Sequence, residues 1–429
     1  MTKTIKIGLL GLGTVGGGVP KILEAQAEKI KQSTGVEIVV AKGLVRDEAE
    51  KALRKTQFEI ELTTNYDDIV EDEEIDIIIE LIGKLEPART FISRALKAGK
   101  HVVTANKDLL AQHGLELIEL AGKNKVDLYY EASVAGGIPI LRTLANSLAD
   151  DGITKVQGIV NGTTNYMLTK MVEEGQSYEE ALAKAQELGF AESDPTNDVD
   201  GIDAAYKMVI LTQFAYGMNI QLEDVARRGI RHVSIDDVKM GQKLGYVIKL
   251  VGETSLLSDG VAAEVAPMLV PVQHPLAAIK NEMNAVFVES MGIGESMYYG
   301  PGAGSLPTAT SIVADVVQIA KNIQSDTTGV PFNPYHLATK LAKDTQIKGK
   351  YYFAIKTPDR KGQILKLAEI FTKYDASFEQ VLQQKANGEH ARVVAISHTI
   401  TNAQFKAIKA EIEQVEGFKL INTLRVLGK

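Results

Sequence analysis

The sequence contains no cysteine among its 429 residues. This absence excludes disulfide bonds, thiolate metal sites and the aldehyde dehydrogenases that use a cysteine nucleophile to form a thioester. Long apolar runs are also missing, because stretches such as residues 75–82 are interrupted by acidic side chains. The first residues, MTKTIKIGLL, lack a signal-peptide pattern. We therefore expect a cytoplasmic protein that has no membrane partner.

The chain also lacks a basic excess, since 47 lysines and arginines stand against 55 acidic residues, for a net charge of −8. A surface that binds nucleic acid usually needs a positive excess, so we expect no nucleic-acid partner. The hydrophobic fraction of 45% and the charged fraction of 24% are ordinary for a globular protein. A chain of this length supports two to four domains.

A glycine-rich turn follows the strand-like residues 4–10. It consists of Gly11, Leu12, Gly13, Thr14, Val15 and Gly16. The pattern G-x-G-x-x-G between a strand and a helix, here predicted to run to about Lys31, is typical of dinucleotide-binding units. Its glycines let the backbone approach a pyrophosphate at the helix N-terminus. The turn predicts a site for NAD or NADP.

The residues after the second predicted strand, 36–45, bear on which of these cofactors binds. Arg46 at this point favours NADP, because a guanidinium pairs with a 2′-phosphate. Asp47 beside it leaves NAD open, since an acidic residue there binds the ribose hydroxyls. An ordinary surface turn is the alternative for both residues.

Strands and helices continue to alternate up to residue 138. We predict strands over 75–82, 101–104 and 126–131 and helices over 87–98 and 108–123. This alternation predicts a Rossmann domain over residues 1–138, with a doubly wound parallel sheet. The turn Thr104-Ala105-Asn106-Lys107 follows the carboxyl end of a strand, where such sheets bind ligands.

An acidic stretch over residues 185–207 is the most distinctive part of the chain. Its five carboxylates lie in a loop and at the start of an apolar helix, at Glu192, Asp194, Asp198, Asp200 and Asp203. Asp203 and Lys207 are four residues apart and so share one helical face. An isolated pair of this kind only stabilises a helix. Here the acidic loop offers acceptors for a cationic amine, and a lysine beside carboxylates is able to deliver a proton.

This stretch is similar to the signature of the homoserine dehydrogenase family. The matching residues are Ala185, Gly189, Phe190, Ala191, Asp194, Pro195, Asp198, Val199, Gly201, Asp203 and Lys207. The resemblance extends over nearly the whole chain. It implies reversible NAD(P)H-dependent reduction of L-aspartate 4-semialdehyde to L-homoserine, in the biosynthesis of threonine, methionine and isoleucine.

The resemblance also implies roles for individual residues. Lys207 is the expected proton donor, Lys107 polarises the carbonyl oxygen, and Asp203 positions Lys207. The expected substrate-binding residues are Glu192 and Asp198, which hold the ammonium group, and Thr163 in the loop 161–166. Thr104, Lys107 and Gly302 are expected beside the nicotinamide.

The resemblance also implies a monovalent cation, with sodium as the first candidate, at the end of the Rossmann domain. Its expected ligands are Glu131 and the carbonyl oxygens of Val134, Gly136 and Ile138. Oxygen ligands suit a hard cation. The family pattern E-x-I-G-G is changed here, because Lys84 stands where the family has its second glycine.

We predict two further domains. Residues 139–323 are expected to form an α+β substrate-binding and dimerisation domain with a mixed sheet, followed by a connector over 324–350. Residues 351–429 have the order βαββαβ, which is ferredoxin-like and resembles the ACT domain. That resemblance implies an amino-acid effector. The turn 357–362 departs from the usual D-x-P-G pattern, so a role in building a homodimer or homotetramer is the rival interpretation.

Two other functions are compatible with the same architecture. One is a dehydrogenase that acts on another small amino acid. The other is an inactive sensor that binds a nucleotide and an amino acid. Neither has a reason to keep Asp203 and Lys207 in register with a matched acidic loop.

Overall fold

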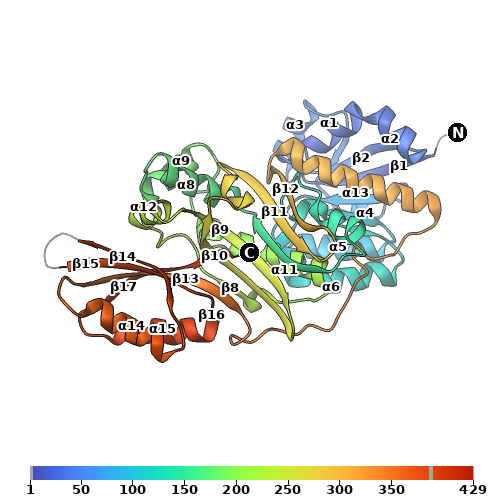
Figure 1. Ribbon diagram of the computed structural model, residues 1–429. Helices are drawn as coiled ribbons and strands as arrows, with labels where there is room; N and C mark the ends of the chain where they lie inside the picture. Colours follow the sequence, from blue (N-terminus) through green and yellow to red (C-terminus); the bar gives the residue numbers. More distant parts are fainter. Residues whose placement is uncertain (1–2, 386–389, 429) are drawn as a thin grey trace. The chain divides into compact units, whose positions relative to one another are not determined.

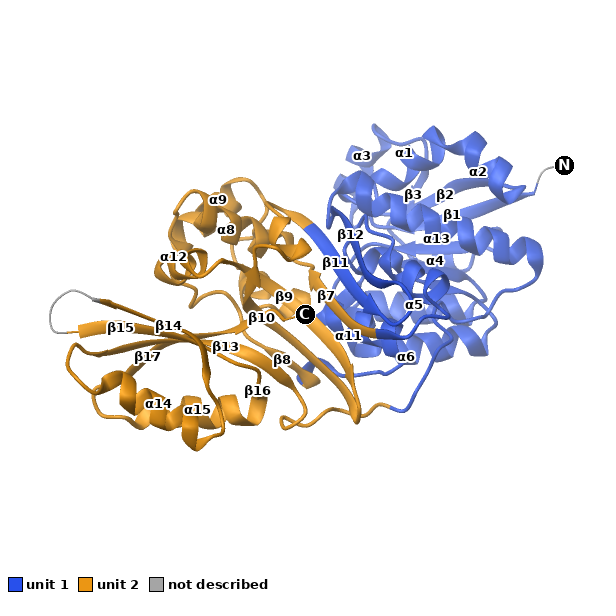
Figure 2. Ribbon diagram, viewed as in Figure 1, with its two compact units in different colours: residues 1–153, 206–223, 284–338 blue, residues 154–205, 224–283, 339–429 orange. Residues whose placement is uncertain are grey.

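The computed structural model describes residues 3–385 and 390–428. The chain forms two compact units (Figure 2). Unit 1 contains residues 1–153, 206–223 and 284–338, and unit 2 contains residues 154–205, 224–283 and 339–429. The units differ from the predicted domains, whose boundaries stay a prediction. Within the described ranges, no helix has the length and apolarity that crossing a membrane requires.

Unit 1 contains a six-stranded parallel sheet with the order β3-β2-β1-β4-β5-β6 (Figure 1). Its strands are β1 (Thr4–Leu10), β2 (Glu37–Leu44), β3 (Glu61–Thr63), β4 (Ile77–Glu80), β5 (His101–Thr104) and β6 (Leu128–Tyr129). This order reverses direction between β1 and β4, and it is that of a doubly wound dinucleotide-binding fold. The sheet therefore confirms the predicted Rossmann fold.

The helices of unit 1 follow the predicted alternation with local differences. They are α1 (Gly18–Ala25), α2 (Ala27–Thr34), α3 (Glu48–Lys55), α4 (Asp67–Val70), α5 (Ala88–Lys97), α6 (Lys107–Lys123), α7 (Ile140–Arg142) and α13 (Ser305–Ser325). The prediction of one helix up to Lys31 is wrong, because Gln26 leaves the helical region at φ −115° and ψ 15°. Helix α13 packs on α1, so the chain returns to the Rossmann unit after residue 284.

Unit 2 is built on a mixed sheet whose strands follow the order β7-β9-β10-β17-β13-β15-β14. These strands are β7 (Ile153–Ile159), β9 (Tyr246–Leu257), β10 (Gly260–Pro271), β13 (Lys348–Pro358), β14 (Phe378–Lys385), β15 (His390–Ser397) and β17 (Lys419–Val426). Two short strands join it, β8 (Val225–Arg227) on β10 and β16 (Ile400–Thr401) on β13. The observed sheet confirms the predicted mixed sheet.

The other helices lie mainly in unit 2. They are α8 (Gly162–Glu173), α9 (Tyr178–Glu187), α10 (Thr196–Val199), α11 (Ile202–Tyr216), α12 (Ile235–Lys243), α14 (Gln363–Lys373) and α15 (Asn402–Gln414). The division between the units falls within α11, and also within the hairpin strand β11 (Met283–Ser290), which precedes β12 (Gly294–Pro301). The prediction of a polar loop over 161–166 is wrong. Asn161 instead caps α8 by accepting a hydrogen bond from the backbone N–H of Thr164.

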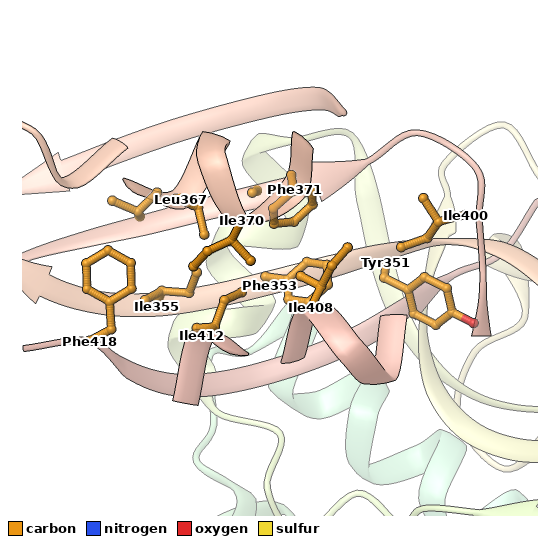
Figure 3. Packing of buried hydrophobic residues seen from close by; sticks show 12 residues of the cluster. Tyr351, Phe353, Ile355, Leu367, Ile370, Phe371, Ile400, Ile408, Ile412 and Phe418 are labelled. Carbon is orange, nitrogen blue, oxygen red and sulfur yellow. The ribbon is translucent and has the colours of Figure 1, made fainter. Parts of the chain in front are cut away.

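The C-terminal residues from β13 to β17 have the order βαββαβ, and their four long strands run β17-β13-β15-β14. Helices α14 and α15 pack on this sheet and share one apolar core with it. This core contains Phe353 of β13, Phe371 of α14 and Ile408 of α15 (Figure 3). The ferredoxin-like arrangement is confirmed, whereas its assignment as an ACT domain stays a prediction. Strand β17 pairs in parallel with β10, so the sheet of this module continues into the central sheet.

Candidate active site

The glycine turn after β1 has the geometry that a dinucleotide requires. Gly11 has φ +94°, a conformation that favours glycine, and its N–H donates to the carbonyl of Leu44 at 3.1 Å. A Cβ on Gly16 would overlap the carbonyl oxygen of Gly11, whereas a Cβ on Gly13 would meet nothing within 4 Å. Gly16 therefore closes the turn, and Gly13 leaves open space beside the backbone; the contact of this turn with a pyrophosphate stays a prediction.

The other residues of the turn divide between core and surface. Leu12 is fully buried, Thr14 is exposed and Val15 is half-buried. Arg46 and Asp47 lie just beyond the end of β2, and the Arg46 Nε is 3.6 Å from the Asp47 carboxylate. Asp47 caps α3 by accepting from the N–H of Glu50 at 2.8 Å. One carboxylate oxygen of Asp47 thus has a structural role, while the Arg46 side chain extends into solvent.

A buried polar network joins the carboxyl ends of β4 and β5. The Thr104 hydroxyl donates to one oxygen of Glu80 at 2.7 Å, and the other oxygen accepts from the N–H groups of Ile82 and Gly83 at 2.8 and 2.9 Å. Thr104 thus supports the sheet edge through its side chain. The role of Glu80 was not predicted, although a buried acidic residue at a strand end is a signal for such a network.

The changed residue Lys84 keeps a glycine-like backbone. Its φ of 62° lies in the left-handed region, and its carbonyl accepts from the Asn106 side chain at 2.6 Å. Asn106 also caps α6 by accepting from the N–H of Leu109 at 3.2 Å. Lys107 is the first residue of α6, and its Nζ is 3.4 Å from the carboxylate of Asp108. The cap therefore fixes the backbone from which Lys107 projects.

Helices α6 and α11 meet within unit 1, where Gln112 donates to the hydroxyl of Tyr206 at 3.3 Å. Tyr206 is the neighbour of Lys207, which is half-buried on α11. Asp203 is one helical turn earlier on the same helix. The predicted spacing of Asp203 and Lys207 on a continuous helix is confirmed, while their chemical roles stay a prediction.

The second glycine turn, which precedes α13, packs against the hinge after β6. A Cβ on Gly302 would overlap the side chain of Asn284, and a Cβ on Gly136 would overlap the backbone of Gly302. Glycine is therefore required at both positions. A Cβ on Gly18, the first residue of α1, would press on Ser305. The residues that follow this turn thus lie beside the first residue of α1, and a contact of Gly302 with the cofactor stays a prediction.

The predicted cation ligands are oxygen atoms with hydrogen-bond partners. The Glu131 carboxylate is buried and accepts from the N–H groups of Leu141 and Arg142 at 2.8 Å each. Burial raises the pKa of Glu131 to about 7. The carbonyl of Gly136 accepts from the Ser311 hydroxyl at 2.7 Å, and the carbonyl of Ile138 accepts from the N–H of Ile140 at 2.8 Å.

Each of these oxygens has a second lone pair, and a cation would offset the cost of the buried Glu131 charge. Val134 is fully buried in the same hinge. Among the described residues, no group of three or more His, Cys, Asp and Glu side chains is placed to hold a metal ion. A cation in this hinge would therefore depend on backbone carbonyls besides Glu131, and the cation itself stays a prediction.

The acidic stretch of unit 2 separates into carboxylates with different partners. Asp194 accepts from the hydroxyl of Thr196 at 2.6 Å and stabilises the turn before α10. Asp200 pairs with Arg231, whose Nε lies 2.5 Å from it. The Glu192 side chain is exposed. Asp194 and Asp200 thus serve local structure.

Asn161 joins Asp198 and Asp203. Its side-chain Nδ2 donates to the Asp198 carboxylate at 2.7 Å and to the Asp203 carboxylate at 2.9 Å. Asn161 is 6% exposed, so this amide holds two carboxylates from different elements in one partly buried cluster. Sequence reasoning placed Asn161 in a loop and missed this role. The available signal was an asparagine directly before an apolar helical pattern, which is typical of an N-cap.

Thr163 supports the same region from the first turn of α8. Its hydroxyl donates to the carbonyl of Phe190 at 2.6 Å, and the residue is buried. Thr163 therefore fastens the start of the acidic loop to α8, and substrate contact by its hydroxyl stays a prediction.

Comparison with known proteins places this architecture in a family. A model of the homoserine dehydrogenase family matches residues 139–317, and a model described as the NAD-binding domain of homoserine dehydrogenase matches residues 11–131. The homoserine dehydrogenase of Lactococcus lactis is 52% identical over 428 residues, which cover 99% of this chain and 100% of that protein. The chain belongs to the homoserine dehydrogenase family. The resemblance inferred from the acidic stretch is thereby confirmed.

Solved structures agree with this assignment. A homoserine dehydrogenase from Thiobacillus denitrificans has a TM-score of 0.94 at 37% identity, covering 99% of both chains. A hyperthermophilic archaeal homoserine dehydrogenase in complex with NADPH has a TM-score of 0.63 at 28% identity, covering 74% of this chain and 97% of that one. Family membership makes the chain an oxidoreductase with an NAD(P)-binding domain.

Proposed function

We propose that the protein catalyses the reversible NAD(P)H-dependent reduction of L-aspartate 4-semialdehyde to L-homoserine. The observation that carries the proposal is the cluster in which Asn161 joins Asp198 to Asp203 on the helix that bears Lys207. A cluster of carboxylates suits the ammonium group of an amino-acid substrate, and the lysine suits the proton transfer that aldehyde reduction requires.

The protein residues divide this chemistry between binding and proton transfer. NAD(P)H, when bound, supplies the hydride for the aldehyde carbon. As the carbon–oxygen electron pair moves to oxygen, Lys207 gives that oxygen a proton, and Lys107 stabilises the developing negative charge. Asp203 positions Lys207 from one helical turn away. Asp198 and Glu192 bind the substrate's ammonium group, and Thr163 contributes a hydroxyl.

The cofactor is held by the turn from Gly11 to Gly16 and by Thr104, Lys107 and Gly302. We propose NADP as the preferred form. Arg46 is exposed at the end of β2 where a 2′-phosphate would lie, whereas Asp47 is engaged in capping α3.

A monovalent cation, in the first instance sodium, is proposed at the hinge formed by Glu131, Val134, Gly136 and Ile138. Its contribution would be to compensate a buried carboxylate and hold the backbone between β6 and α7. The support is the buried Glu131 carboxylate together with oxygen-only donors.

The remaining proposals concern domains and assembly. Residues 1–138 bind the cofactor, and residues 139–323 bind substrate and build a homodimer or homotetramer. Residues 324–350 connect this domain to residues 351–429, which form an ACT domain that binds an amino-acid effector. The ferredoxin-like order of the last segment supports the ACT assignment.

The function is tested by oxidation of L-homoserine with NAD or NADP, followed at the absorbance of the reduced cofactor. We expect turnover with homoserine and much less with L-serine or with 3-aminopropan-1-ol, which is homoserine without its carboxylate. Turnover that favours another amino alcohol would assign a different substrate. A cofactor-binding protein without turnover of any of them would be a sensor.

A further inference from the structure

The connector that follows α13 contains two buried residues in an otherwise exposed stretch. Phe332 is 5% exposed and Asn333 is 8% exposed, whereas the residues on either side of them lie at the surface. Pro331 and Pro334 flank the pair, and each proline fixes its own φ and restricts the residue before it. A passive link between domains needs neither burial nor a rigid backbone, so this pair has a more specific role, which its contacts define.

Phe332 completes a cluster of aromatic rings between β6 and α11. Its ring centroid lies 5.1 Å from that of Phe214 in α11 and 5.4 Å from that of Tyr130, which follows β6. The rings of Tyr130 and Phe214 also meet edge to face, with their centroids 5.7 Å apart. Aromatic side chains prefer such spacing and steep interplanar angles. Because each of the three residues is at most 5% exposed, Phe332 fixes the distance between α11 and the end of the parallel sheet.

Asn333 binds the C-terminal end of α11. The carbonyl groups at the end of an α-helix are often satisfied by side chains from outside the helix. The Nδ2 of Asn333 donates to the carbonyl of Gln213 at 3.0 Å and to that of Phe214 at 3.4 Å, both in the last turn of α11. Its Oδ1 accepts from the N–H of Tyr335 at 3.2 Å, so the connector itself fixes the orientation of this amide. Asn333 therefore ties the end of α11 to a rigid segment of backbone.

Helix α11 carries Lys207 about two turns before these contacts. Phe214 follows Lys207 by seven residues, so the two side chains lie on nearly the same helical face, about 10 Å apart along the axis. Nearer its other end, α11 contacts α6 through the hydrogen bond from Gln112 to the hydroxyl of Tyr206 at 3.3 Å. Contacts at two points determine both the position of this helix segment along its axis and its rotation.

We propose that Phe332 and Asn333 are positioning residues, which place the ammonium group of Lys207 for proton transfer. The inference rests on the proposed function, because that function gives Lys207 its role. A proton donor must lie within hydrogen-bond reach of the oxygen that it protonates. A misplacement of about 1 Å costs on the order of 100-fold in rate. The connector thus acts on catalysis through the position of α11.

The test is a double-mutant cycle with Lys207→Met, measured as kcat for the oxidation of L-homoserine with whichever of NAD and NADP gives the higher turnover. Phe332→Ala removes the ring, and Asn333→Asp keeps the acceptor for the Tyr335 N–H but removes the donor to α11. Each change should lower kcat about 10-fold in the otherwise wild-type chain and leave KM for the cofactor unchanged. In the Lys207→Met chain each should lower the remaining kcat by less than about 2-fold, because no lysine is left to misplace.

Two further variants separate positioning from folding. Phe332→Leu still fills much of the space of the ring and should retain most of kcat. Tyr335→Ala removes an aromatic side chain that is 49% exposed in the same connector, and it should leave kcat unchanged in both backgrounds. Urea denaturation and circular dichroism check that each variant is folded. Where Phe332→Ala does not fold, the cycle with Asn333→Asp decides.

The outcomes distinguish this inference from the proposed function. A loss of kcat that multiplies with that of Lys207→Met would mean that the connector only stabilises the fold, and it would overturn the positioning role while the proposed function stands. An unchanged kcat in both Phe332→Ala and Asn333→Asp would overturn that role as well. A wild-type protein that does not oxidise homoserine would refute the proposed function and the inference with it.

Discussion

The nucleotide turn of unit 1 and the acidic cluster of unit 2 are both polar, but the first is formed by backbone groups and the second by charged side chains. The nucleotide turn is defined by missing side chains, since Gly11 and Gly16 allow its path and Gly13 leaves space beside it. The acidic cluster is defined by charged side chains that Asn161 holds together. Substitutions should therefore act through volume at the first site and through charge at the second.

Lys100 in unit 1 and Lys249 in unit 2 are both buried, and they differ in how well nearby charges compensate their burial. Lys100 in unit 1 donates to the carbonyls of Asp72 and Ile75 and has carboxylates nearby that partly compensate its burial. Lys249 in unit 2 donates to the side chain of Asn165 in α8 and to the carbonyl of Ile279, and its compensation is weaker. Unit 2 thus contains a buried lysine whose charge is sensitive to pH.

The largest effect should come from removing the charge of Lys207. We expect Lys207→Met to lower kcat by about 100-fold or more, the scale of a positioned general acid, while the apolar face of α11 preserves the fold. Steady-state kinetics and circular dichroism provide the measurement. Lys29→Met, on the exposed surface of α2, is the matched control. A Lys207→Met variant with a near wild-type kcat would show that charge at this position is not part of the chemistry.

The second effect concerns Lys249 and pH. Burial lowers its pKa from 10.5 to about 8, so the unfolded chain binds more protons between these values. The cost of burying the charged form is therefore full below about pH 8 and is relieved as pH rises towards 10.5. Between pH 7 and 10, the unfolding free energy of wild type should gain about 2 kcal/mol relative to Lys249→Met.

Urea denaturation at several pH values measures this difference. Lys29→Met should give a nearly constant difference over the same range because its side chain is exposed. A constant difference for Lys249→Met as well would mean that the ammonium of Lys249 is solvated in the folded protein.

The third effect tests charge on the nucleotide side. Arg46→Ala should raise KM for NADP about 10-fold, the lower range for one charge-assisted hydrogen bond, and leave KM for NAD nearly unchanged. Parallel kinetics with both cofactors supply the internal control. Equal changes for NAD and NADP would argue that Arg46 does not contact the 2′-phosphate.

The smallest effect should come from volume alone. Gly13→Ala places a methyl group in the open space beside the turn, so we expect unchanged stability and a cost of about 1 kcal/mol in cofactor binding, the lower range for an added methyl group in a packed contact. Fluorescence titration with NADPH and thermal unfolding measure the two quantities. Gly122→Ala, in α6 and also facing open space, is the control and should not alter cofactor binding. Normal affinity in Gly13→Ala would place the pyrophosphate elsewhere.

Much of the Rossmann unit was predictable because its signals are local. Alternating strand and helix patterns give the parallel sheet, and β5 has the predicted bounds. The break between α1 and α2 was not predictable, since no glycine or proline marks Gln26. Asn161 was misplaced in a loop because an N-cap and a loop residue have the same composition signal.

The sequence by itself determined the family, the nucleotide turn, and the one-turn spacing of Asp203 and Lys207, because each depends on residues close together in the chain. Only the tertiary structure decided which carboxylates of the acidic stretch have structural partners. The partners Arg231 and Asn161 are far from these carboxylates in the sequence, although they contact them in the fold. The tertiary structure also decided that α13 packs on α1 and that β17 pairs with β10. Such pairings depend on which buried surfaces and backbone hydrogen bonds match over long separations, and no local pattern encodes them.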